Sequence, residues 1–259
     1  MGPREELAEW VRPKAETCPH GVRILAKIAK PYPQSAYSGL GMLLQLELQY
    51  LQRTTPGVGS LMGPIEDSLI EAFLPALFGG EEVSANLREI LGHSVKHRGR
   101  SIPDPWLLAK CAYSTSKVAS EILVGSLLGG NDLKYVAHKG CVRRASADGK
   151  NQQEIAEKAV LSRRKELTDG AGLNRLQRAT VNGAWLTTIP HCLNVTYFSW
   201  EEFQDNLLLR HRIVTFNLPT KCDGCGKNFS VPHALSSPKG GLVMARHNDA
   251  AKEWSALSA

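Results

Sequence analysis

The sequence predicts a mainly α-helical protein, with a multi-helix body followed by a small, irregular C-terminal module. Apolar residues recur at three- and four-residue steps along most of the chain, which is the period of a helix face. Glycine pairs at 79–80 and 129–130 end two of these patterns. Beyond Pro219 the periodicity is lost and a Cys-x2-Cys motif appears. We therefore expect a helical body over residues 1–218 and a knuckle-like module with a tail over residues 219–259.

The first strong helical pattern begins after Pro33 and Ser35 and ends at the turn-forming residues 54–59. Six residues define its apolar face: Tyr37, Leu40, Leu43, Leu44, Leu48 and Leu51. Further helices are expected over residues 64–78, 82–92, 105–128, 152–166, 173–185 and 200–211.

Two features argue against helix elsewhere. Pro13 and Pro19 should interrupt any N-terminal helix, because an interior proline removes a hydrogen bond and clashes with the preceding turn. Strand signals are weak, and the two best candidates are residues 212–218 and 193–198, which are rich in β-branched and aromatic side chains.

The composition of the 259 residues, with 42% hydrophobic and 22% charged side chains, is that of an ordinary globular protein. No apolar run reaches the roughly 18 residues that a bilayer requires, and the charged N-terminus lacks the apolar core of a signal peptide. The six cysteines are scattered except for the final pair, which argues against a disulfide framework. We expect an intracellular protein, nuclear or cytoplasmic, with no membrane partner.

Positive charge is concentrated in one segment. Residues 134–165 carry nine basic and three acidic side chains, a surplus as large as the net charge of +6 of the whole chain. A clustered basic surface is typical of proteins that bind a phosphate backbone. A solvated helix face is the competing interpretation, because charge runs on exposed helices are common.

The motif Cys222-Asp-Gly-Cys225, with His233 eight residues further on, has the spacing with which a zinc knuckle begins. Three ligands do not complete the tetrahedral shell of structural zinc. His247 is a further candidate ligand, or it joins Arg246 at a phosphate. The competing interpretation is a loop with two free thiols and a hydrogen-bonded histidine.

No catalytic motif is evident, so we do not expect an enzyme. Asp104 and the Asp132-Leu-Lys134 run loosely imitate the carboxylates and lysine of a nuclease. A helix start explains Asp104 and a turn explains Asp132. The chain has no Walker loop and no Gly-x-Ser-x-Gly elbow.

A series of short motifs resembles the region downstream of the reverse transcriptase domain in non-LTR retrotransposon polyproteins, particularly those with a restriction-like endonuclease. The C-terminal motifs are Cys222-Asp-Gly-Cys225, Phe229-Ser230, His233-Ala-Leu235, Gly240-Gly241-Leu242 and Arg246-His247-Asn248. The upstream motifs are Pro33-Gln-Ser-Ala-Tyr37, Gln49-Tyr50-Leu-Gln-Arg53, Phe73-Leu-Pro-Ala-Leu-Phe-Gly79, Gly183-Ala-Trp-Leu186 and Leu218-Pro-Thr220. Their order along nearly the whole chain carries the resemblance.

The resemblance implies a helical thumb and connector followed by a Cys-Cys-His-Cys knuckle, with the polymerase palm and the nuclease both outside this chain. Ser237 stands where the last cysteine of the knuckle belongs. A serine hydroxyl is a poor substitute for a thiolate on zinc, so we expect an incomplete zinc site unless His247, Asp249 or water completes it.

These observations predict a non-catalytic fragment of a retroelement polyprotein that binds nucleic acid, whether DNA, RNA or a hybrid, and that contacts other parts of such a polyprotein. The expected metal ligands are Cys222, Cys225, His233 and His247. The expected nucleic-acid contacts are Lys139, Arg143, Arg144, Lys150, Arg163, Arg164, Lys165, Lys227 and Arg246. Two alternatives stay open: a helical scaffold that binds other proteins, and a decayed retroelement remnant without selected function.

Overall fold

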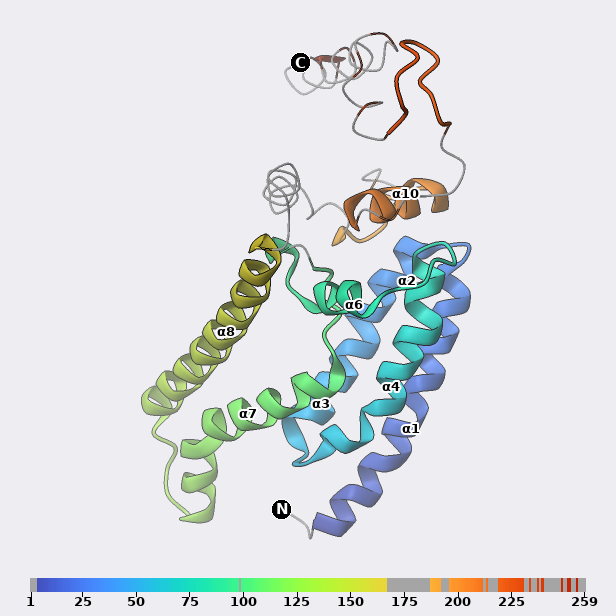
Figure 1. The fold of residues 1–259 in the computed structure, drawn as a ribbon. Coiled ribbons are helices and arrows are strands. Elements are labelled where there is room, and N and C mark those ends of the chain that lie inside the picture. Colours follow the sequence, from blue (N-terminus) through green and yellow to red (C-terminus); the bar gives the residue numbers. More distant parts are fainter. Residues whose placement is uncertain are drawn as a thin grey trace. The chain divides into compact units, whose positions relative to one another are not determined.

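Figure 1 shows the fold of the chain in a computed structural model. The described residues are 4–97, 99–166, 187–191, 196–211, 219–230 and the single positions 213, 233, 237, 239, 248, 251, 252 and 255; at 4–8 and 164–166 only the backbone is described. The chain divides into two units, Met1–His211 and Arg212–Ala259, and each is considered by itself.

Helices account for most of the described residues, which confirms the predicted mainly α fold. The α-helices are α1 (Arg4–Ala29), α2 (Pro33–Gly39), α3 (Gln45–Thr54), α4 (Gly63–Ser68), α5 (Leu74–Leu77), α6 (Ala85–Gly92), α7 (Pro105–Leu128), α8 (Tyr135–Glu166) and α10 (Trp200–His211). Short π-helical turns, η1 (Leu40–Leu44) and η3 (Leu69–Phe73), and 3-10 turns, η2 (Val58–Leu61) and η4 (Val95–His97), lie between them. Within the described residues there is no strand, only an isolated bridge between Lys221 and Asn228.

The core of the first unit lies where α1 packs against the segment from α4 to α5 and against α2 (Figure 1). Its side chains are large and aliphatic or aromatic, as an interior that excludes water requires. The most deeply buried include Val11, Val22, Leu51, Ile65, Phe73 and Leu77.

Helix α1 is continuous through Pro13 and Pro19, so the predicted interruption at these residues is wrong. An interior proline costs a helix about 3 kcal/mol in isolation. Along α1, apolar residues at helical spacing, among them Val11, Ala15 and Val22, are buried. The apolar contacts along this face offset the cost of the two prolines, because tertiary packing routinely overrides helix propensity.

Two of the predicted helices are present, but each contains a π-helical turn. The predicted helix around residues 37–51 is α2, η1 and α3 in succession, and the predicted helix over residues 64–78 is α4, η3 and α5. A π-turn inserts an extra residue and rotates the following side chains. Consistent with this, Leu43 is 69% exposed although the sequence places it on the apolar face.

Helix α7 has the predicted bounds. The Asp104 carboxylate accepts hydrogen bonds from the amides of Trp106 and Leu107 at 2.7 and 3.3 Å, which satisfies donors at the helix start. The helix ends before Gly129, and Gly130 follows with a φ of 60°. The structural interpretation of Asp104 is therefore confirmed.

Helix α8 begins at Tyr135, well before the predicted start at residue 152. Its first half forms an antiparallel hairpin with α7 (Figure 1) and buries only small residues, Cys141 and Ala145. The Cys141 thiol donates to the Val118 carbonyl at 3.1 Å, and a Cβ built at Gly149 would lie 3.4 Å from Thr115. Close packing of small residues, with few large apolar side chains to reveal a period, explains why the sequence pattern missed this half.

Helix α10 buries Phe203, Leu207 and Leu208 and lies beside α2. A buried glutamine, Gln34, bridges to the segment before α10: its amide donates to the Thr196 carbonyl at 2.7 Å, and its oxygen accepts from the Phe198 amide at 2.8 Å.

The predicted helix over residues 173–185 lies outside the described residues. Of the two predicted strands, 193–198 and 212–218, the structure describes only positions 196–198 and 213, and none of these is in a strand. The other residues of both segments lie outside the described residues. Among the described helices, none combines the length and apolar character of a bilayer-spanning segment.

Candidate metal centre and basic surface

The second unit contains a short hairpin around the cysteine motif. The Cys222 amide donates to the Lys227 carbonyl at 2.8 Å, and the Phe229 amide donates to the Thr220 carbonyl at 3.0 Å. At the tip the Gly226 amide donates to the Cys222 carbonyl at 2.7 Å. These bonds fold the chain back on itself, so both cysteines lie at one tight turn.

Two glycines permit this turn. Gly226 has a φ of 69°, in the left-handed region that side-chain-bearing residues rarely adopt. A Cβ at Gly224 would lie 2.8 Å from the Lys239 carbonyl oxygen, too close for any residue but glycine. The Gly224 contact also shows that Lys239 lies beside the hairpin.

The structure brings Cys222, Cys225 and His233 together. One ligand atom from each lies within 4.8 Å of the others, and Cys225 Sγ is 3.1 Å from His233 Nε2. Ligands around one tetrahedral zinc ion, at about 2.3 Å for sulfur and 2.0 Å for nitrogen, are separated by roughly 3.5–3.8 Å. The three residues therefore form a cluster that can hold a metal ion.

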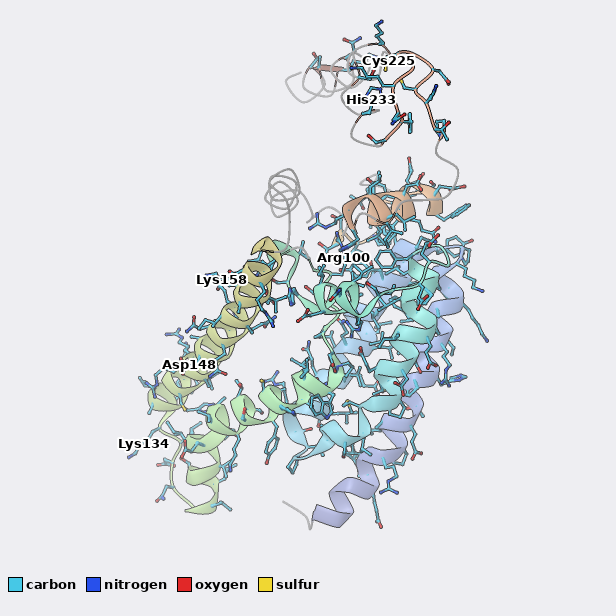
Figure 2. All side chains as sticks on the ribbon, viewed as in Figure 1. Arg100, Lys134, Asp148, Lys158, Cys225 and His233 are labelled. Atoms are coloured by element: carbon cyan, nitrogen blue, oxygen red, sulfur yellow. The ribbon has the colours of Figure 1, made fainter. Side chains whose placement is uncertain are left out.

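The electrostatics of the cluster favour a thiolate. The pKa of Cys222 is lowered to about 7, chiefly by a hydrogen bond with His233 and then by the backbone amides of Gly224 and Cys225. Because the thiolate and not the thiol is the metal ligand, a lowered pKa prepares Cys222 for coordination near neutral pH. Figure 2 labels Cys225 and His233 in this unit.

Ser237, the position of the missing cysteine, lies four residues after His233, and its amide donates to the His233 carbonyl at 2.8 Å. The residue is buried, and its hydroxyl accepts from the Lys239 amide at 3.4 Å. The hydrogen bond to the His233 carbonyl brings the backbone of Ser237 next to that of the histidine. His247 and Arg246 lie outside the described residues.

The predicted basic contacts fall mainly on α8. Lys139, Arg143 and Lys150 are exposed and separated by four and seven residues, so they share one face of the helix, opposite Cys141 and Ala145. Lys139 Nζ also lies 5.8 Å from the centre of the Tyr135 ring. The first half of α8 therefore presents a basic stripe, defined here as Lys139, Arg143 and Lys150.

The stripe does not continue unbroken to the end of α8. Glu154 pairs with Lys158 at 3.1 Å and with Lys96 at 3.3 Å, which neutralises part of the positive charge. Arg163 follows Lys158 by five residues, so its side chain is rotated by about 140° around the helix axis from that of Lys158, and the two do not share a face. Figure 2 shows Lys134, Asp148 and Lys158 spaced along this hairpin.

The remaining predicted contacts are distributed differently. Arg144 is exposed on α8 but is rotated by about 100° around the helix from Arg143, away from the basic stripe. Lys227 is exposed on the knuckle of the second unit. The side chains of Arg164 and Lys165 lie outside the described residues.

Comparison of the chain with family models, with curated proteins and with solved structures gave no match. The resemblance to retrotransposon polyproteins therefore rests on the order of the sequence motifs and stays a prediction.

Proposed function

We propose that this chain is a non-catalytic nucleic-acid-binding module of the kind found in retroelement reverse transcriptase polyproteins. The observation that carries the proposal is the basic stripe on α8, because three exposed cations at helical spacing face solvent together. Unlike Lys158, none of the three is in a salt bridge with a described residue.

The stripe suits contacts with a phosphate backbone. Three side chains along about three helical turns reach successive phosphates, and each contact releases counterions. Backbone contacts of this kind position a protein on DNA, RNA or a hybrid without reading its sequence.

We further propose that the cluster in the second unit binds zinc. Two thiolates and an imidazole are the ligands that zinc prefers in structural sites. Cys222, Cys225 and His233 would hold the ion, and binding would stabilise the hairpin against unfolding. The exposed lysine of the hairpin, Lys227, would then be held in place for a phosphate contact.

The test compares two triple variants with the same change in net charge. One replaces Lys139, Arg143 and Lys150 with glutamine, and the other replaces three exposed cations of α1, Arg12, Arg23 and Lys27, with glutamine. Binding to labelled DNA, RNA and hybrid duplexes of equal length is measured by fluorescence anisotropy at low salt. The proposal expects the α8 variant to bind at least about tenfold more weakly than the α1 variant, since each lost contact weakens binding. Equal affinities for the two variants would refute it.

A protein-binding scaffold is the second candidate, and one observation favours it. Leu43, Leu46 and Tyr50 are each more than half exposed and recur at helical spacing along η1 and α3. Salt distinguishes the two functions, because an apolar interface hardly responds to ionic strength whereas backbone binding weakens steeply.

A further inference from the structure

Arg100 is a fully buried cation in the helical body (Figure 2), with 1% of its surface exposed. None of its three guanidinium nitrogens meets hydrogen-bond geometry with a described residue, and the Tyr37 hydroxyl is the polar group near enough to raise its pKa. A buried charge without a partner is strongly destabilising, so such a group requires an explanation.

The backbone around Arg100 fixes this side chain inside. The amides of Arg100 and Ile102 both donate to the Leu91 carbonyl at 3.0 Å, and the Ser101 amide donates to the His93 carbonyl at 2.8 Å. Ser101 has a φ of 54°, a left-handed conformation that is uncommon for serine. The surrounding hydrogen bonds hold this strained turn, and the turn directs Arg100 inward.

A second buried arginine, Arg88, shows how the same region normally satisfies such a charge. Its guanidinium forms two 2.6 Å bonds with the Glu66 carboxylate and donates to the Ile102 carbonyl at 2.7 Å. The pair is bidentate, which is the preferred geometry of arginine with a carboxylate. Arg100 has no carboxylate of this kind among the described residues.

A further cation lies close to Arg100. Arg210, on α10, has two buried guanidinium nitrogens without a hydrogen-bond partner in the described part of the chain. Burial and then the charge of Arg210 lower the pKa of Arg100 to about 10, and the nearby Tyr37 hydroxyl offsets this only in part. Two cations near each other, both with buried guanidinium nitrogens, favour the binding of an anion.

Arg100 lines a pocket of about 290 Å³, close to the lower limit of small-molecule sites, about 300–1,000 Å³. Hydroxyl and amide groups dominate the polar part of its lining, and the described lining residues include no Asp or Glu. The polar lining residues are Tyr37, Ser38, Gln45, Arg100, Ser101 and Thr187. Tyr37 and Gln45 also brace the turn, donating to the Arg100 and Ser101 carbonyls at 2.6 and 3.0 Å.

We infer that Arg100 and the pocket that it lines form a binding site for a phosphoryl group, with Arg210 as a second cation nearby. Two guanidinium groups match the charge of a phosphate monoester, and the planar fork of arginine suits its oxygens. The hydroxyl-rich pocket offers further donors and no competing carboxylate among the described residues. The site is separate from the basic stripe and does not depend on it.

The experiment measures thermal unfolding of the full chain with inorganic phosphate, compared with chloride at equal ionic strength. Phosphate should raise the Tm of the parent in a saturable manner, because a ligand that binds only the folded state stabilises it. Arg100→Met should weaken phosphate binding by about 100-fold, and Arg210→Gln, at a less buried side chain, should weaken it in the same direction.

In phosphate-free buffer, substitutions at the two buried arginines should change the Tm in opposite directions. Arg100→Met should raise the Tm in phosphate-free buffer, because it removes an unpaired buried charge. Arg88→Met should lower it, because Glu66 is left unpaired, and Arg23→Met on the surface of α1 should change neither the Tm nor the phosphate response. The inference is overturned by the absence of a phosphate response in the parent, by an unchanged response in both Arg100→Met and Arg210→Gln, or by a fall in Tm in Arg100→Met as large as that in Arg88→Met. That fall would show that Arg100 already has an anionic partner within the chain.

Further titrations in the same experiment identify the kind of molecule that carries the phosphoryl group. A nucleoside monophosphate and a 5′-phosphorylated oligonucleotide are titrated beside inorganic phosphate, with the 5′-hydroxyl oligonucleotide as the control. A response to the phosphorylated but not the 5′-hydroxyl oligonucleotide identifies a nucleic-acid end, and a response to the small ions alone identifies free phosphate or a small ester.

Discussion

Ser237 and His233 are joined by a backbone hydrogen bond of 2.8 Å, which brings the backbone of the serine next to that of a candidate metal ligand. Ser237→Cys should therefore supply a fourth thiolate and tighten zinc binding by at least about tenfold, since it closes a tetrahedral shell. Competition with a chromophoric chelator at neutral pH measures the change.

The same competition assay should show the opposite effect for His233→Ala, which leaves two thiolates. An unchanged zinc affinity in Ser237→Cys would mean that these residues do not converge on one ion. A control for a general effect of added thiols is Ser114→Cys, on the exposed face of α7.

The cysteines should differ sharply in reactivity with pH. Cys222, whose pKa is lowered to about 7, should be about half thiolate at neutral pH in the metal-free protein. Burial first, and then the charge of Glu47, raise the pKa of Cys18 to about 11. Alkylation by iodoacetamide, followed peptide by peptide with mass spectrometry, should therefore rise through pH 7 at Cys222 and stay negligible at Cys18. Equal rates at the two sites would contradict the described environment of Cys222.

Protons should also compete with zinc at this site. Because the folded pKa of Cys222 is depressed from 9.0, thiolate stabilisation is complete above pH 9 and is lost as the pH falls through about 7. Zinc affinity should accordingly fall between pH 8 and pH 6, which the chelator assay measures directly. A pH-independent affinity in that interval would exclude Cys222 as a ligand.

Glu157 should anchor the second half of α8. Its carboxylate accepts from the Ser94 hydroxyl and amide at 2.7 and 3.0 Å and from Gln153 at 2.8 Å, and it pairs with His97. Glu157→Leu should lower the free energy of unfolding by about 1–3 kcal/mol, because buried donors lose their acceptor. Hydrogen exchange should increase around residue 157 and not in α1, and unchanged protection there would contradict the anchoring role.

The Glu157 carboxylate should also make the stability of the fold depend on pH in the acid range. Burial raises the pKa of Glu157, but the hydrogen bonds from Ser94, Gln153 and His97 outweigh burial and lower it below 4.5. A depressed folded pKa contributes stability above the unfolded value, and this contribution is lost as the pH falls through the folded value. Chemical denaturation of the parent and of Glu157→Leu should therefore converge in stability below pH 4.5.

Pro13→Ala should stabilise the protein. Pro13 is exposed in the interior of α1, where alanine restores an amide donor and removes a steric clash. The gain should be about 1–2 kcal/mol, reduced by the greater entropy of the unfolded alanine chain. A loss of stability by urea denaturation would show that the ring of Pro13 makes a contact that the helix needs.

Sequence periodicity predicted the helices that bury large apolar residues at regular steps. It placed α7 between Asp104 and Gly129 because both ends carry recognisable signals. It missed the first half of α8, whose packing uses Cys141, Ala145 and Gly149, and it overestimated the effect of Pro13 and Pro19 on α1. In both cases tertiary packing decided the outcome, and no local pattern reports it.

The sequence indicated one of the candidate sites and not the other. The Cys-x2-Cys spacing indicated a metal cluster because two ligands lie in one turn and the third is nearby in sequence. Arg100 carries no such signal, since its burial and the lack of a described carboxylate beside it depend on residues distant in the chain, such as Tyr37 and Arg210.

The salt dependence of nucleic-acid binding tests the proposed function most directly. Log affinity for a DNA duplex is measured against log salt concentration for the parent and for the variant with glutamine at Lys139, Arg143 and Lys150. We expect a steep negative slope in the parent, reduced by about one unit for each lost phosphate contact in the variant. A parent whose affinity does not change with salt, or a variant with the slope and affinity of the parent, would contradict binding through α8.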